Sequence, residues 1–312
     1  MSTITIKDHT WQVILNPNAY SGKSKKHWVN IATTLDELQI AYQVHPANQA
    51  NAGREIVKQL CLDGKRHFII IGGDGTVNEV VNGIAISGIN TSEAFIVPFP
   101  IGTGNDWVHT HQYPKDYNQL FKPLLAGQFQ RHDMGIVKTM QDDQIIDSRY
   151  FINIAGFCFD ATVISSSQNK KPYFASAVYL WNLLKVLLTY KAQPVTVKTD
   201  DDEFSKSVFT MAVGICKYNG NGMMQVPMGN PFDGLFDVVI IKKISKLKVL
   251  ANVMKLFSGK HIALPEVSVY QTKELEIKSI PPVLGEVEGE MLTSGNYKIS
   301  IIPGAVNVLV ME

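Results

Sequence analysis

The stretch 67–83 constrains the fold more than any other part of the chain, because three kinds of structure follow one another within it. It reads His-Phe-Ile-Ile-Ile-Gly-Gly-Asp-Gly-Thr-Val-Asn-Glu-Val-Val-Asn-Gly. The apolar run predicts a buried strand, the glycines predict a tight turn, and the valines predict the start of a helix with a buried face. Because the N-terminus of a helix attracts anions, the turn is a candidate phosphate site.

Strands and helices alternate through the first 130 residues. Such alternation predicts a parallel sheet with helices on both faces. Ligands of these sheets bind at the carboxyl ends of the strands, where the glycine turn lies. We expect strands at residues 12–15, 41–44, 68–71 and 95–98, and helices from 24 to about 38, at 54–62, at 77–86 and from 107 onward.

The second half of the chain has a different pattern, dominated by short strand-like runs. It predicts a mainly antiparallel β-sandwich over residues 131–302, after an α/β domain over residues 1–130. Helices are expected only at 175–190 and 246–257. The predicted strands lie at 135–138, 149–155, 194–199, 208–216, 236–242, 266–270, 274–278, 298–302 and 305–310.

Composition narrows the choice of compartment and partner. The formal net charge is +1, so no bulk attraction to nucleic acid is expected. Three cysteines without metal-ligand spacing indicate reduced thiols in a cytoplasmic protein. No run reaches the ~20 apolar residues of a membrane span. The most apolar run, 174–190, is either a core-packing helix or a surface that meets lipid, with Lys170 and Lys171 nearby.

The loop after the first strand, residues 16–24, ends in Gly-Lys-Ser like a P-loop. A P-loop needs a glycine five residues before Gly22, but Pro17 stands there and has no backbone N–H to donate. The loop therefore predicts either a looser nucleotide-contacting turn, with Asn16 and Ser21 as polar contacts, or a plain turn between strand and helix.

Two further loops each carry glycines, a threonine and a single aspartate. Asp74 lies in the loop of residues 72–76, where Thr76 could cap the helix or donate to phosphate, and Asp106 ends the loop of residues 98–106. A carboxylate repels phosphate unless a cation lies between them. Since both loops follow strands of one parallel sheet, we expect them to meet at one crevice and hold a cation with phosphate.

Two later segments leave alternatives open. Glu286, Glu288 and Glu290 alternate, so on one strand they share a face. They are either a solvated strand edge or place Glu290 in the crevice as a general base. The Asp233-Gly234 pair is either a plain turn or, with nearby carbonyls, a site for a hard cation.

At these residues the chain resembles the diacylglycerol kinase catalytic family, in particular its soluble bacterial lipid-kinase branch, which is related to sphingosine kinases. The stretch Gly-Gly-Asp-Gly-Thr-x-Asn-Glu-x-x-Asn-Gly is highly specific. The matching pieces run in the family's order over nearly the whole chain: Asn16-Pro17 with residues 21–23, residues 72–83, residues 102–106, residues 233–235 and Gly289-Glu290.

The resemblance implies an active site between an N-terminal α/β domain, completed by residues 303–312, and the β-sandwich. It implies ATP and Mg²⁺, with Asp74 and Asp106 at the metal and Glu290 as general base. A structural Mg²⁺ is implied at Asn230, Asp233 and Leu235. The implied nucleotide contacts are Asn16, Ser21, Gly22, Gly72, Gly73, Gly75, Thr76, Asn78, Glu79, Gly102, Thr103 and Asn105.

The chain departs from the family at Glu288, where Asp is usual, and at Phe232, where an acidic residue is frequent. We expect an ATP-dependent kinase of diacylglycerol or a related lipid, cytoplasmic and transiently bound to a membrane surface without a transmembrane segment. A kinase of a soluble acceptor such as NAD, and a nucleotide-binding regulator without activity, are the alternatives. The sequence leaves the oligomeric state open, with a homodimer among the options.

Overall fold

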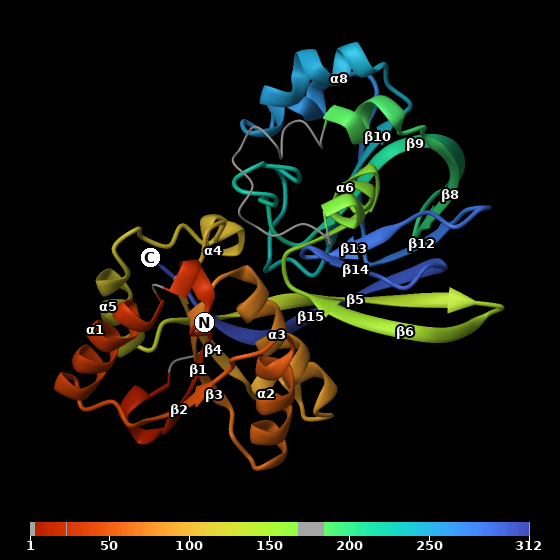
Figure 1. Cartoon of the computed structure of the whole chain (residues 1–312). Coiled ribbons are helices and arrows are strands. Elements are labelled where there is room, and N and C mark those ends of the chain that lie inside the picture. The colour runs from red at the N-terminus through yellow and green to blue at the C-terminus, as the bar shows by residue number, and fades with distance from the viewer. Residues whose placement is uncertain (1–3, 23, 168–183, 312) are drawn as a thin grey trace.

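The computed structural model describes residues 4–22, 24–167 and 184–311. Figure 1 shows two lobes, with the red-to-yellow N-terminal half in one and most of the green-to-blue remainder in the other. Fifteen strands of the described residues form a single sheet that runs through both lobes. The hydrophobic core follows this sheet, so the two lobes share one continuous apolar interior.

The N-terminal lobe has the predicted parallel sheet, which is confirmed. Its strands are β1 (Trp11–Leu15), β2 (Tyr42–Pro46), β3 (His67–Gly72) and β4 (Phe95–Pro100), in the order β4-β3-β1-β2. Both faces are covered, and all five residues of β1 are buried. In Figure 1 one face carries α1 and α5 and the other carries α2 and α3. The helices are α1 (Ser24–Glu37), α2 (Ala52–Leu62), α3 (Asp74–Ile86), α4 (Asp106–Thr110) and α5 (Phe121–Leu125).

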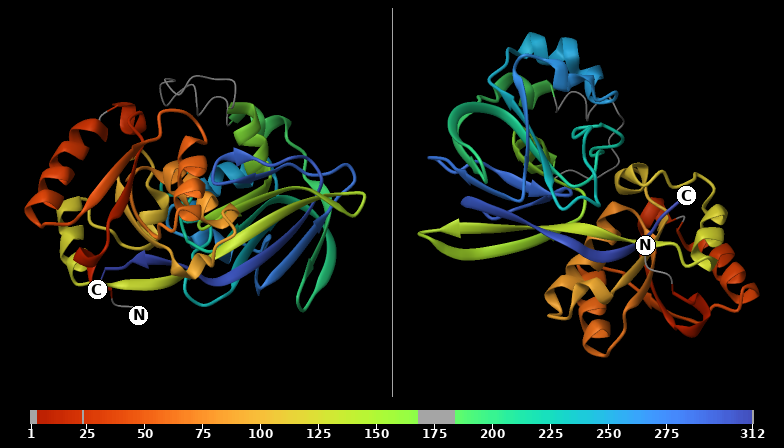
Figure 2. Two further views of the ribbon diagram at one scale, coloured as in Figure 1. Left: turned by 90° about the horizontal axis from the view of Figure 1, so that it is seen from below. Right: turned by 180° about the vertical axis from the view of Figure 1, so that it is seen from behind.

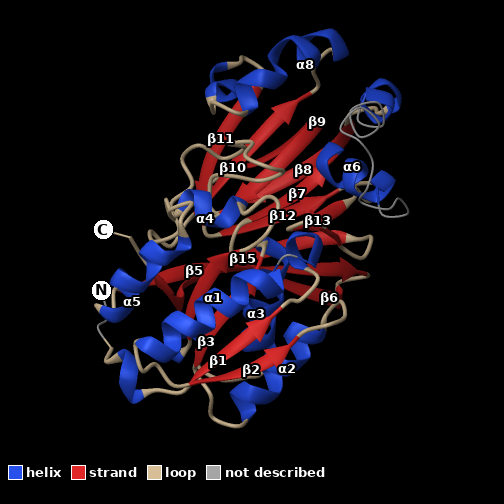
Figure 3. Cartoon of the chain, turned by 60° about the vertical axis from the view of Figure 1, so that its left-hand side comes forward, coloured by secondary structure: helices blue, strands red, loops and turns tan. Residues whose placement is uncertain are grey.

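The second lobe is antiparallel, as predicted. Strand β9 is central because it pairs with β7, β8 and β10. The strands are β5 (Phe129–Gln141), β6 (Gln144–Phe151), β7 (Ile154–Cys158), β8 (Gln193–Thr199), β9 (Glu203–Gly214), β10 (Phe236–Lys242), β11 (Val267–Thr272), β12 (Glu274–Lys278), β13 (Gly285–Val287), β14 (Glu290–Met291) and β15 (Asn296–Leu309). Its helices include α6 (Phe159–Ser167) and α8 (Lys246–Asn252), drawn in blue in Figure 3.

Strands β5 and β15 connect the two lobes. They pair antiparallel over almost their full lengths, and β15 then pairs parallel to β4 at Asn307 and Val308. Their register shifts between Ile302 and Val306, at Pro303 and Gly304 of the continuous strand β15. Figure 2 shows the two long strands passing from one lobe into the other. The expected boundary near residue 131 therefore falls inside a strand and not in a linker.

Several elements differ from the prediction for identifiable reasons. The run 149–155 is two strands, β6 and β7, because the chain bends at Ile152 and Asn153. The runs 298–302 and 305–310 are one strand, β15, and α6 was not predicted. The helix expected at 246–257 is α8 followed by a 3-10 turn at Val253–Leu256.

Most of the predicted helix at 175–190 lies outside the described residues, as do Lys170 and Lys171; residues 184–189 are helical. Among the described residues, no helix has the length and apolarity that a membrane crossing requires. Further short 3-10 helices lie at Ile6–Asp8, Ala19–Gly22, Thr91–Glu93, Tyr117–Leu120 and Lys260–Ala263.

Candidate active site

The loops after β3 and β4 meet at their glycines. A Cβ added to Gly102 would lie 2.5 Å from the Cα of Gly73, so neither position tolerates a side chain without moving the other loop. Helix α3 begins directly behind, at Asp74, with Gly73 as its N-cap. Thr76, which was expected to cap the helix or to donate to phosphate, lies inside the first turn of α3. The two glycine loops thus form one continuous edge at the carboxyl ends of the strands.

Asp74 joins the two loops. Its Oδ2 accepts a hydrogen bond from the backbone N–H of Asp106 at 3.1 Å, and its Oδ1 accepts one from the N–H of Trp107 at 3.0 Å. These amides belong to the first turn of α4 and have no partner within the helix, so the carboxylate satisfies them. Asp74 therefore fixes the position of the loop of residues 98–106 against the loop of residues 72–76. One lone pair on each carboxylate oxygen of Asp74 is left for another ligand.

Asp106 joins the two lobes. It is buried, and its two oxygens accept hydrogen bonds from the backbone N–H groups of Asn221 at 2.9 Å and Gly222 at 2.6 Å. Burial raises the pKa of the Asp106 carboxyl, the two amides lower it, and the nearby Asp74 charge raises it again. The turn at 219–223, which the sequence did not mark as functional, thereby becomes part of the site.

Three side-chain oxygens converge beside Gly104. A Cβ built there would lie 3.0 Å from Asn221 Oδ1, 3.3 Å from Asp74 Oδ2 and 3.6 Å from Asp106 Oδ2. Two carboxylates and an amide oxygen around one small space are the hard ligands that Mg²⁺ takes. The residues present therefore fit a divalent cation, and the missing side chain at Gly104 leaves room beside it.

The first loop is attached to the second through Asn16. Its Nδ2 donates to Thr76 Oγ1 at 3.2 Å, and its Oδ1 accepts from the Asn18 N–H at 3.0 Å. Gly22 has φ of +83° and Gly75 has nothing within 4 Å of its Cβ position, so backbone at both places is open to a ligand. Thr103 is exposed, and the side chain of Ser21 lies outside the description.

Glu79, Asn105 and Asn78, three further residues expected at the nucleotide, form hydrogen bonds within the protein, and their contact with a nucleotide stays a prediction. Glu79 accepts hydrogen bonds from the N–H groups of Asn51 at 3.0 Å and Gly53 at 2.8 Å, which caps the start of α2. Asn105, with φ of +55°, donates to two carbonyls of its own loop. Asn78 donates to Glu288 Oε2 at 2.8 Å. Gly72 packs against Thr76.

The three alternating glutamates do not share one strand face, so that prediction was wrong. Glu288 and Gly289 have φ of +50° and +87° and reverse the chain between β13 and β14, as in a primed hairpin turn. The reversal ends the two-residue alternation. Glu286 is buried, the Glu288 carboxyl is enclosed by protein, and Glu290 is exposed.

Glu288 is the hairpin residue whose carboxyl group interacts electrostatically with Asp74. Its Oε1 accepts from the N–H groups of Ile152 and Asn153, both at 2.8 Å, which explains the bend between β6 and β7. Burial raises the pKa of Glu288 to about 7, against these bonds, and the Asp74 charge adds to the increase. Burial also raises the pKa of Glu286 to about 8, although the Gly289 N–H donates to it.

Glu290 forms an ion pair with Arg149 of β6. Among the described residues, no hydrogen bond links Glu290 to Asp74 or Asp106. Its approach to the crevice stays a prediction.

The turn at 229–235 closes on itself and on Asp133. Asp233 Oδ1 accepts from the Leu235 N–H at 3.0 Å, and Asn230 Oδ1 accepts from the Phe232 N–H at 3.3 Å. The buried Asp133 accepts from Gly234 N–H and Gly304 N–H, both at 2.7 Å. Asp133, which sequence reasoning missed, thus links this turn to the register shift in β15. A metal at Asn230, Asp233 and Leu235 stays a prediction.

Comparisons with known proteins show to which family the chain belongs. Residues 10–137 match the diacylglycerol kinase catalytic domain, and residues 153–310 match the YegS C-terminal NAD kinase beta sandwich-like domain. The chain is 29% identical to a diacylglycerol kinase of Staphylococcus saprophyticus over 72% of this chain and 70% of that one. It is 25% identical to a diacylglycerol kinase of Staphylococcus carnosus, over 89% of this chain and 88% of that one.

The fold is also that of a crystal structure of a diacylglycerol kinase from Bacillus anthracis, with a TM-score of 0.71, 16% identity and 97% of each chain covered. Both halves of the chain thus match, in order, a catalytic domain and a C-terminal domain of known kinases. The chain belongs to the diacylglycerol kinase catalytic family of lipid kinases.

Proposed function

We propose that the protein transfers the γ-phosphate of ATP, with Mg²⁺, to the hydroxyl of diacylglycerol or a related lipid, in the cleft between its lobes. The observation that carries the proposal is the convergence of Asp74, Asp106 and Asn221 oxygens beside Gly104. In phosphoryl transfer the protein mainly positions groups and balances charge, and this cluster can do both.

Asp74 and Asp106 would hold the Mg²⁺, whose charge offsets that of the phosphates as the phosphoryl group moves. The amides at the start of α3, near the open Gly75, would hold phosphate oxygens. Both aspartates are already oriented by backbone N–H groups. Little rearrangement is therefore needed before the nucleotide is aligned.

Glu290 is proposed as the base that takes the proton of the acceptor hydroxyl. Glu290 lies at the start of the short strand β14, two residues after Glu288. The carboxyl group of Glu288 is within electrostatic range of Asp74. Arg149 of β6 forms an ion pair with the Glu290 carboxylate. The short hairpin would place the base beside the cation site while leaving it open to an acceptor.

A lipid acceptor needs apolar space, and the second lobe offers a cavity of about 410 Å³. Its lining is mixed: Leu284, Pro282, Val186, Cys158 and Tyr190 supply apolar surface, and Thr162, Thr189, Lys191 and Gln193 supply polar groups. Leu284 directly precedes β13, which leads to Glu288 and Glu290. The cavity is therefore connected through one short strand to the residues proposed for catalysis.

An exposed apolar stripe lies next to this cavity and is proposed to meet the membrane. Leu247, Leu250, Met254 and Phe257 of α8 and the following turn are between 45% and 81% exposed, at spacings of three and four residues. Lys255 and Lys260 beside them are exposed and suit anionic headgroups. Lys246 at the start of α8 bonds the carbonyls of Leu187 and Tyr190, which attaches the stripe to the cavity wall.

The activity is tested by incubating the purified protein with labelled ATP and Mg²⁺ on a panel of diacylglycerol, ceramide, sphingosine and phosphatidylglycerol in liposomes, with NAD as a soluble acceptor. We expect phosphorylation of a lipid, and a decrease in kcat of ~10²–10⁴-fold in Glu290→Gln. Glu274→Gln, at an exposed glutamate far along the same lobe, is the matched control. Phosphorylation of NAD alone, or full activity of Glu290→Gln on the true substrate, would contradict the proposal.

Membrane docking is tested separately by sedimentation with liposomes that contain phosphatidylglycerol. The double variant Leu247→Glu, Met254→Glu should remain in the supernatant, because charge replaces the apolar stripe. Val29→Glu on α1 is the control, since Val29 is 62% exposed but lies on the other lobe. Equal sedimentation of both variants would show that the stripe does not dock.

A further inference from the structure

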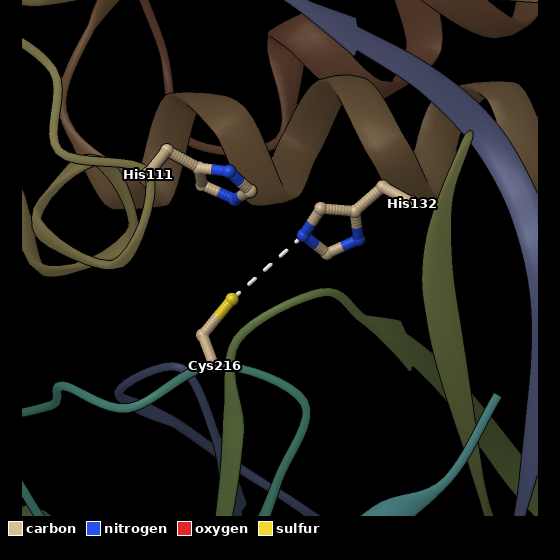
Figure 4. Close-up of side chains that lie close together, drawn as sticks. All are labelled: His111, His132 and Cys216. Atoms are coloured by element: carbon tan, nitrogen blue, oxygen red, sulfur yellow. Dashed lines mark hydrogen bonds between the residues drawn. The ribbon is translucent and has the colours of Figure 1, made fainter. Parts of the chain in front are cut away.

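Two histidines and a cysteine that the proposed reaction does not use lie together inside the molecule. His111 follows α4, His132 belongs to β5 and Cys216 follows β9, and all three are buried. One ligand atom of each lies within 4.8 Å of the others. Figure 4 shows the two imidazole rings and the thiol around a common space. Three residues from three distant parts of the chain thus face one another.

His111 is the member whose hydrogen bonding is incomplete. It is 8% exposed, and its Nε2 is buried without a hydrogen-bond partner in the described structure. A buried polar atom without a partner costs about 1–3 kcal/mol. The ring is held by packing against Trp107, His132 and Phe232 and not by polar contacts. A ligand on Nε2 would remove this cost.

His132 already has the hydrogen bond that a metal-binding histidine makes. Its Nδ1 lies 2.5 Å from the carbonyl oxygen of Asp133, so Nδ1 carries the proton. Nε2 is therefore left with its lone pair, and it faces Cys216 Sγ at 3.7 Å. Metal-bound histidines typically donate their second ring N–H to a carbonyl or carboxylate, which fixes the tautomer.

The spacing suits a tetrahedral ion. Bonds of ~2.0 Å to nitrogen and ~2.3 Å to sulfur place N and S roughly 3.5 Å apart. The 3.7 Å between His132 Nε2 and Cys216 Sγ is close to that value. The ligand atoms of all three residues lie within 4.8 Å of one another, so only a small movement of the His111 ring is needed to bind the same ion. His111 is also one of the residues that line a cavity of about 460 Å³.

We propose that His111, His132 and Cys216 bind one transition-metal ion of the Zn²⁺ type, with water in the fourth position. On binding, the S–H bond of Cys216 breaks, a sulfur–metal bond forms and the proton leaves to solvent, while each imidazole contributes a lone pair. Two nitrogens and a thiolate favour Zn²⁺ over Mg²⁺, which takes oxygen ligands.

The site would join the lobes behind the cation cluster of the crevice. His111 lies five residues after Asp106. Cys216 lies five residues before Asn221, whose backbone N–H donates a hydrogen bond to Asp106. A metal here would hold together the two segments that carry the Asp106 contact. The inference does not depend on the proposed kinase activity, because binding can be measured without substrate.

The test is titration of Co²⁺ into the full-length protein, purified in chelating buffer and then freed of chelator. We expect one equivalent to bind, with a thiolate-to-cobalt charge-transfer band, tetrahedral d–d bands and release of one proton. Added Zn²⁺ should remove the bands. Cys216→Ser should abolish the charge-transfer band, whereas Cys158→Ser, at a buried cysteine outside the cluster, should keep it.

A variant that keeps the ring packing guards against loss of folding. His111→Phe preserves an aromatic ring against Trp107 and Phe232 and should weaken Co²⁺ binding by at least the ~10–100-fold typical of perturbed metal sites. Its near-ultraviolet circular dichroism should match the wild type. A wild-type protein without a thiolate band, or a band that survives Cys216→Ser, would overturn the proposal.

Discussion

Burial affects the carboxylates of the two lobes to different degrees, although it raises the pKa of Asp106 as well. In the N-terminal lobe, each oxygen of Asp74 and Asp106 accepts a backbone N–H from a neighbouring loop. In the hairpin of the second lobe, amides also reach Glu286 and Glu288, but burial outweighs them and raises their pKa to about 8 and about 7. The difference teaches that the aspartates are prepared to meet a cation, whereas the glutamates are prepared to keep protons near neutral pH.

The largest expected effect is at Asp74. In Asp74→Asn the side-chain amide can accept only one of the two α4 N–H groups and carries no charge for a cation. We expect kcat to fall by roughly 10²–10³-fold or more, as when one charge-stabilising group is removed from an active site. A kinase assay with Asp201→Asn, at an exposed aspartate of the other lobe, provides the comparison. Near-normal activity would remove Asp74 from the reaction.

The next effect concerns stability and pH at Glu286. Its folded pKa of about 8 exceeds the ordinary 4.5, so between these values the folded state keeps a proton that the unfolded state has lost. The contribution of Glu286 to the free energy of unfolding is therefore complete below pH 4.5 and is lost as the pH rises through 8. We expect the free energy of unfolding to fall by roughly 2–4 kcal/mol from pH 5 to pH 8, at ~1.4 kcal/mol per pKa unit.

Glu286→Gln removes this titration while leaving an oxygen for the Gly289 N–H. Urea unfolding at a series of pH values should therefore show a shallower decline in the variant. Glu274→Gln, at an exposed position, should follow the wild type. Parallel curves for wild type and Glu286→Gln would mean that the hairpin does not retain the proton.

A smaller effect is expected at Glu288, where the two groups of carboxylates interact. As pH rises through about 7, Glu288 gains a negative charge within range of Asp74. The apparent affinity for Mg²⁺ should then increase several-fold, roughly three- to tenfold for ~1 kcal/mol of added attraction. Glu288→Gln should flatten this dependence in Mg²⁺ titrations of the reaction rate. If Glu288→Gln kept the wild-type pH profile, the charge on Glu288 would have no influence on Mg²⁺ binding near Asp74.

The smallest effect is expected at Glu79, whose carboxylate caps the start of α2. Glu79→Gln should lower the free energy of unfolding by about 0.5–1.5 kcal/mol, as for loss of a helix cap, and leave KM for ATP unchanged. Thermal unfolding and initial rates measure the two quantities. A raised KM with unchanged stability would instead assign Glu79 to the nucleotide.

The sequence was sufficient where function follows from a few neighbouring residues. Strand, glycine turn and helix lie within residues 67–83, so the parallel sheet and the meeting of the Asp74 and Asp106 loops could be predicted. The hairpin could not, because the positive φ of Glu288 is set by its contacts with Ile152 and Asn153. The amides of Asn221 and Gly222 likewise reach Asp106 across more than 100 residues, which no local pattern encodes.

The ribbon of β5 and β15 has a mechanical consequence. Both strands continue from one lobe into the other, so the lobes can approach only by twisting or bending a hydrogen-bonded ladder. The ladder opposes this deformation elastically and restores the open arrangement. The easiest place to bend is the register shift at Pro303 and Gly304, where Asp133 accepts the Gly304 N–H. We therefore expect closure to be small and elastic, with slow hydrogen exchange along β5 throughout turnover; rapid exchange there would indicate a hinge that opens by local unfolding.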